Sequence, residues 1–70
     1  MGNTLRGRTM QPDELKAIRK SLGLSQARMG DALGLTGQFI GFMENGKAGI
    51  ERRTALAVRY LAEHPEAVDE

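Results

Sequence analysis

The 70-residue sequence contains no cysteine and no tryptophan, and aromatic residues make up only 4% of it. Without cysteine the chain can form neither a disulfide nor a thiolate metal site, so neither of these stabilises the fold. A chain of this length lies near the lower limit at which a hydrophobic core alone can stabilise a domain. The sequence therefore predicts a single domain that depends on close helical packing or on oligomerisation.

Long apolar runs are also missing, and so are the groups that carry catalysis. No stretch approaches a membrane-spanning length, and the N-terminus does not resemble a signal peptide, which predicts a cytoplasmic protein without a membrane partner. The single histidine, His64, and the serines Ser21 and Ser25 all stand near expected helix ends. No carboxylate pair is spaced for acid–base work and metal ligands are too few. We expect no enzyme activity, no metal and no other cofactor.

Charge is unevenly distributed, although the net charge is only +1. Residues 1–60 carry all ten basic residues against five acidic ones, whereas residues 61–70 carry four acidic residues and no basic one. A basic body suits nucleic-acid binding, because lysine and arginine displace the counterions of phosphates. An ordinary solvated surface would explain the same pattern.

Helical periodicity predicts an all-α fold, a compact bundle of four or five short helices. The helices are expected over about residues 12–22, 25–33, 36–45 and 50–63, and a glycine or proline follows each of them. Ser25 and Thr36 are good N-terminal caps for the second and third helices. Only Leu35 and Thr36 separate the stop signal Gly34 from the third helix, so a tight turn joins these two helices.

Three parts of the chain are distinguished by composition. Residues 1–9 are polar, contain two glycines and are expected to form a flexible arm that carries Arg6 and Arg8. These arginines would enter a minor groove or clasp a nucleic-acid backbone, unless the arm is simply disordered. Residues 10–64 form the predicted helical domain, and residues 65–70 form an acidic C-terminal tail.

The third predicted helix has an unusual outward face. At about 100° per residue, Ile40 and Met43 lie on one side as a core stripe. The opposite half carries two glycines, two amides and one aromatic residue: Gly37, Gln38, Gly41, Phe42 and Asn45. Glycine inside a helix costs roughly 1 kcal/mol relative to alanine, so two of them indicate a close approach of the helix backbone to something else.

The segment LSQARMGDALGLTGQFIGFMENGK resembles the helix-turn-helix of the Cro/repressor (XRE) family of DNA-binding proteins. The shared features are Leu-Ser-Gln at the start of the second helix, Leu-Gly in the turn, a threonine cap and the run Ile-x-x-Met-Glu-Asn-Gly-Lys. LKAIRKSLG resembles the family's first helix, so the resemblance covers roughly residues 13–61. It implies a lambda-repressor-like helix-turn-helix domain. The small size is similar to that of phage Cro-like proteins and of the autorepressors that accompany anti-CRISPR genes.

The resemblance implies roles for individual residues, because the family's recognition helix enters the major groove while the preceding helix crosses the backbone. By position, base edges would be contacted by Thr36, Gly37, Gln38, Gly41 and Phe42. Phosphates would be contacted by Gln26, Arg28, Asn45 and Lys47, together with backbone N–H groups near Gly46. Gln38 could pair with adenine and Phe42 could pack on a thymine methyl. Family members also often pair an arginine with a glutamate between the first and third helices, which implies a structural ion pair between Arg19 and Glu44.

The implied partner is double-stranded DNA with a pseudo-palindromic operator, bound by a homodimer. The segment ERRTALAVRYLAEH is the candidate interface, with Val58 or Tyr60 at the dimer contact and Leu56 and Leu61 in the core; alternatively, this helix only closes the core. We expect a transcriptional repressor that acts on its own gene, with no small-molecule ligand. The alternative is a protein-binding module, such as an antitoxin or adaptor, on the same scaffold with an exposed phenylalanine as anchor.

Overall fold

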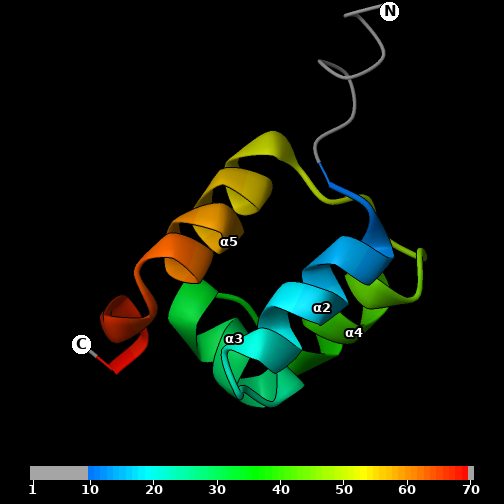
Figure 1. The fold of residues 1–70 in the computed structure, drawn as a ribbon. Helices are drawn as coiled ribbons and strands as arrows, with labels where there is room; N and C mark the ends of the chain where they lie inside the picture. Colours follow the sequence, from blue (N-terminus) through cyan, green and yellow to red (C-terminus); the bar gives the residue numbers. More distant parts are fainter. Residues whose placement is uncertain (1–9, 70) are drawn as a thin grey trace, which may run out of the picture.

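The computed structural model describes residues 10–69 of the chain, which fold into helices joined by short connections (Figure 1). The expected arm with Arg6 and Arg8 lies outside the described residues. The elements are α2 (Pro12–Ser21), α3 (Gln26–Leu33), α4 (Gly37–Glu44), α5 (Arg52–Glu63) and the 3₁₀ helix η1 (Pro65–Asp69). The described residues contain no strand, which confirms the predicted all-α class. Helix α2 packs against α4 and α5, and α3 packs mainly against α4.

Local hydrogen bonds explain where α3 and α4 begin. The Ser25 hydroxyl accepts a hydrogen bond from the backbone N–H of Arg28 at 3.1 Å, and the Thr36 hydroxyl accepts one from that of Phe39 at 3.0 Å. Each satisfies a helix-terminal donor that would otherwise lack a partner. Gly34 ends α3 with a φ of 74°, a left-handed conformation that glycine adopts without steric cost. The predicted tight turn between α3 and α4 is therefore confirmed.

The core is built from one to three apolar residues of each α-helix and from the segments beside them. Met10 and Leu15 bracket the start of α2 and are both buried, as expected for an apolar pair on either side of a helix N-terminus. The buried apolar residues are Met10, Leu15, Met29, Ile40, Met43, Ile50, Ala55, Val58 and Leu61. Three of them are methionines, whose flexible side chains fill irregular space in a small core.

Helices α3 and α4 approach each other closely at two glycines. A Cβ atom added to Gly30 would lie 2.8 Å from the carbonyl oxygen of Leu35, and one added to Gly37 would lie 2.8 Å from the Cα of Ala27. Real Cβ atoms essentially never come this close to backbone. Because these two positions lack side chains, the turn can close and α4 can pack directly against the backbone of α3.

Helix α5 buries a different face from the one that the sequence predicts. Ala55, Val58 and Leu61 are buried, whereas Leu56 is 56% exposed. The predictions that Leu56 lies in the core and that Val58 lies at a surface interface are both wrong. Apolar residues cover more than one face of this helix, and its packing against α2, α3 and η1 selects the face that contains Val58.

The C-terminal residues add a short element to the domain. His64 ends α5 as its cap, and residues 65–69 form η1 instead of continuing as a plain tail. Ala67 and Val68 are partly buried against the core. This extension covers part of α5, which the sequence expectation of a separate acidic tail did not include.

Candidate nucleic-acid interface

The outward face of α4 is made of side chains that the core does not use. Ile40 and Met43 are completely buried on the inward side. Gln38 and Asn45 are exposed, and Phe42 keeps 40% of its surface in contact with solvent. An exposed aromatic ring between two amides is a surface suited to contact with another molecule, because the ring offers apolar area and the amides offer hydrogen bonds.

Phe39 belongs to the same surface, although it is not among the residues that the sequence predicts to contact DNA. It is 38% exposed and precedes Phe42 by three residues, so the two rings occupy neighbouring positions on α4. The sequence contained the signal for this pair, since both phenylalanines of the chain stand at helical spacing in one helix. The structure adds that neither ring is buried in the core.

Gly37 and Gly41, both expected to face DNA bases, have different surroundings. The position of a Gly37 side chain is blocked by Ala27 of α3, so this glycine serves helix packing. That Gly37 also faces base edges stays a prediction, because this contact concerns the position of a side chain and Gly37 itself is only half-buried. A Cβ atom on Gly41 would lie 3.5 Å from Oε1 of Gln26, an ordinary contact with a side chain at the surface.

An ion pair joins α2 to α4 behind this surface. The Arg19 guanidinium donates from Nε to Oε2 of Glu44 at 2.7 Å and from Nη2 to Oε1 at 3.1 Å, and Nη1 donates to the Leu24 carbonyl at 3.0 Å. The two side chains are 11% and 3% exposed. The structure thus brings together the two residues that the family resemblance paired. This fork-like geometry fixes the distance between the helices.

Gln26, which was expected to contact phosphate, forms a hydrogen bond with the same ion pair. Its Nε2 donates to Oε1 of Glu44 at 3.2 Å, although the residue itself is exposed at the start of α3. The Glu44 carboxylate therefore receives hydrogen bonds from two helices. It ties α2 and the N-terminus of α3 to the end of α4.

These contacts determine the protonation of the pair. Burial by itself would raise the pKa of Glu44, but hydrogen bonds from Arg19 and Gln26 and the charges of Arg19 and Lys16 outweigh it, so the pKa lies below its ordinary value. The hydrogen bond to Glu44 raises the pKa of Arg19, although its partial burial acts the other way. Both groups are consequently charged at neutral pH.

At the C-terminal end of α4, side chains are exposed to solvent, whereas the backbone N–H groups are already hydrogen-bonded. The backbone N–H groups of Asn45, Gly46, Lys47 and Ala48 all donate to carbonyl oxygens of residues 41–43. The expected phosphate contacts from backbone N–H groups near Gly46 are therefore wrong, because these donors already have partners. The side chains of Asn45 and Lys47 are exposed, as is that of Arg28 on α3.

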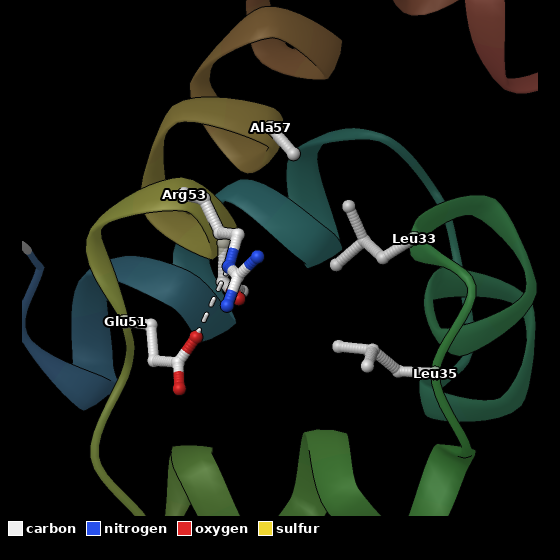
Figure 2. A pocket seen from close by; sticks show the side chains of 6 residues that line it. Leu33, Leu35, Glu51, Arg53 and Ala57 are labelled. Carbon is white, nitrogen blue, oxygen red and sulfur yellow. Dashed lines mark hydrogen bonds and ion pairs between the residues drawn. The ribbon is translucent and has the colours of Figure 1, made fainter.

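A shallow groove of about 420 Å³ lies on another side of the domain, between the α3–α4 turn and the start of α5. Figure 2 shows Leu33 and Leu35 pointing across it toward Arg53 and Ala57 of α5. An exposed ion pair between Arg53 and Glu51, with an N–O distance of 3.4 Å, lies at its edge. Ala57 precedes the exposed residue Tyr60 by three positions, so groove and helix offer a continuous stretch of partly apolar surface.

Comparison with known proteins agrees with this geometry. No helix within residues 10–69 is long and apolar enough to cross a membrane. No curated protein and no solved structure matches the chain. The sequence model of a helix-turn-helix family matches residues 15–58, which include all of α3 and α4 and most of α2. The chain therefore belongs to the XRE-type helix-turn-helix family of DNA-binding proteins.

Proposed function

We propose that this protein is a sequence-specific transcriptional regulator that binds double-stranded DNA as a homodimer and represses its own promoter. The observation that carries this proposal is the outward face of α4, where Gln38, Phe42 and Asn45 are exposed on a helix fixed from behind by α3. A helix held in this way can enter the major groove as a rigid unit, because neither its position nor its rotation has to change on binding.

Direct readout rests on few side chains. Gln38 is the outward amide suited to a bidentate pair with adenine, and the rings of Phe39 and Phe42 suit the methyl group of thymine. The Thr36 hydroxyl accepts the capping hydrogen bond from Phe39, and its O–H is the group that could donate to a base. The exposed side chains of Arg28, Asn45 and Lys47 suit phosphate contacts on either side of the helix.

The dimer contact is assigned to α5, with Leu56 and Tyr60 in place of Val58. These two residues are four positions apart and 56% and 55% exposed. A second copy is the expected occupant, since a single helix reads only a half-site and two-fold dimers of this family place two half-sites about one helical turn apart. The neighbouring groove with Leu33, Leu35 and Ala57 extends this surface.

Selection of bound sequences from a random double-stranded DNA pool tests the proposal. We expect a pseudo-palindromic consensus, and a logarithmic binding constant that falls linearly with logarithmic salt concentration, by about 0.9 per phosphate contacted. The DNA upstream of the protein's own gene should be retarded in a gel. Recovery of no enriched sequence, or affinity that does not change with salt, would contradict DNA recognition.

A second candidate is a protein-binding module on the same scaffold, favoured by the adjacent exposed rings of Phe39 and Phe42. Exposed aromatic residues frequently anchor protein interfaces. Salt separates the two functions, because an apolar protein interface does not weaken with salt as a phosphate interface does. Two exposed cations, Arg28 on α3 and Lys47 shortly after the end of α4, favour DNA.

A further inference from the structure

Helix α4 carries no exposed charge. Its one charged residue is Glu44, whose side chain is 3% exposed and is held by Arg19. Guanine is most often read by arginine or lysine, and the amino group of cytosine by a carboxylate. Neither kind of reading group is available on α4. Its outward side chains therefore recognise a partner through amides and through two phenylalanine rings.

The two rings form one apolar area beside the amide of Gln38. Phe39 and Phe42 are 38% and 40% exposed and stand three positions apart, which places their side chains next to each other on the helix. Gln38 precedes Phe42 by four positions and lies on the other side of that ring. Among the described residues, the other large apolar side chains that are exposed, Leu56 and Tyr60, belong to α5. The apolar area on α4 is thus separate from the proposed dimer surface.

Packing beneath the rings keeps them at the surface. Ile40 and Met43 each follow one of the rings in the sequence, and both are completely buried. The backbone N–H of Phe39 donates to the Thr36 hydroxyl at 3.0 Å, which fixes the first turn of the helix. Because the core is already filled at these positions, the exposed parts of both rings stay available to a partner.

The major groove of DNA offers a specific apolar group to such rings, the methyl group at C5 of thymine. A ring that covers a donor or acceptor of a base edge leaves that group without a hydrogen bond, which weakens binding. Cytosine that has been methylated at C5 carries its methyl group at the same ring position as thymine. An amide distinguishes the two bases by their hydrogen bonds, whereas an apolar ring contacts the methyl group of either one.

We propose that Phe39 and Phe42 recognise C5-methyl groups in the major groove, on thymine or on 5-methylcytosine, so that cytosine methylation at these positions of the operator strengthens binding. This inference rests on the proposed DNA-binding function and adds to it a dependence on the methylation state of the DNA. Burial of one methyl group against a ring corresponds to a factor of about four in affinity.

The first test changes only the DNA. Each thymine of the selected operator is replaced in turn by deoxyuridine, which keeps the hydrogen-bonding groups of thymine but lacks its methyl group. We expect the affinity, measured by fluorescence anisotropy with the full chain, to fall about fourfold at the positions that the rings contact. With a cytosine–guanine pair at those positions, methylation of the cytosine at C5 should raise the affinity about fourfold.

Variants of the protein then assign the effect to the rings. Phe39→Ala and Phe42→Ala should each bind thymine and deoxyuridine with equal affinity at the position that the missing ring contacts. Gln38→Ala is the comparison variant, because it should bind more weakly but keep the ratio between thymine and deoxyuridine. Thermal unfolding of each variant identifies losses that come from the fold, and the test with modified DNA does not depend on any variant.

Three results would overturn this inference while leaving the proposed function intact. The first is equal affinity for thymine and deoxyuridine at every position, and the second is the absence of any gain from methylated cytosine. The third is a preference for thymine over deoxyuridine that persists in both phenylalanine variants, since the methyl group would then act without the rings. Failure of the unmodified protein to select any sequence would instead contradict the proposed function itself.

Discussion

The Arg19 guanidinium of α2 and the Glu44 carboxylate of α4 form a two-point ion pair, with Nε–Oε2 and Nη2–Oε1 distances of 2.7 and 3.1 Å. Glu44 is the last residue of α4, so the pair fixes the end of the proposed reading helix relative to the core. Its orientation therefore depends on a contact that does not itself touch DNA.

Replacement of Glu44 by alanine should destabilise the domain by about 3 kcal/mol, because the variant leaves a nearly buried arginine without its partner. Urea unfolding measures this loss. Glu14→Ala is the matched control, since its pair with Arg59 is more than 40% exposed and should contribute at most about 1 kcal/mol. Equal stability of the two variants would contradict a structural role for Glu44.

The same pair predicts how stability depends on acid. The pKa of Glu44 is lowered in the folded state, so its contribution is complete above the unfolded pKa of about 4.3 and is lost as pH falls through the folded value. The pKa of Arg19 is raised, so the guanidinium stays charged at neutral and acid pH and only protonation of Glu44 removes the ion pair in this range. The difference in unfolding free energy between the native chain and Glu44→Gln should narrow below about pH 4.3. A difference that stays constant down to about pH 3 would refute this assignment.

The two glycines of the α4 surface should respond in opposite ways to alanine. Gly37→Ala should destabilise the domain by about 1–3 kcal/mol, because its Cβ would overlap the Ala27 backbone at 2.8 Å. Gly41→Ala should be neutral or stabilise by up to about 1 kcal/mol, since alanine favours helix and its nearest neighbour is a surface side chain. Thermal unfolding compares them, and the reverse order would mean that α3 and α4 pack differently.

The assignment of the dimer surface predicts a change in mass. Tyr60→Asp and Leu56→Asp place a charge on the exposed face of α5 and should yield folded monomers, because a charge at an apolar contact is not compensated. Light scattering measures the mass, and Ala17→Asp on the exposed surface of α2 serves as control. Dimers that persist in both α5 variants would place the contact elsewhere. Val58→Asp is not a suitable probe, since Val58 is buried and the variant should unfold.

Binding measurements should distinguish residues that read bases from residues that contact phosphates. Gln38→Ala should relax the preference for one base pair by about 1–3 kcal/mol, whereas Lys47→Ala should weaken binding to all sequences and reduce the salt slope by about one. Fluorescence anisotropy with the selected operator and single-base variants of it measures both. An unchanged preference in Gln38→Ala would mean that α4 positions the protein without reading the sequence through this residue.

The sequence by itself determined where the helices lie and to which family the chain belongs. The ends of α3 and α4 follow from Ser25, Gly34 and Thr36, because capping and left-handed turns depend on residues that are close along the chain. The inward stripe of α4, Ile40 and Met43, followed from helical periodicity and is buried as predicted.

Only the tertiary structure decided which faces of these helices are used. Helix α5 is apolar on more than one side, so helical periodicity could not distinguish the buried Val58 from the exposed Leu56. The packing of α5 against the neighbouring helices determines which of the two is buried. The packing role of Gly37 and the orientation of Gln26 also depend on a partner helix. Ala27 of α3 leaves no room for a side chain at position 37, and Glu44 of α4 accepts a hydrogen bond from Gln26. Contacts between helices set these features, and such contacts are not encoded in the local pattern of a single helix.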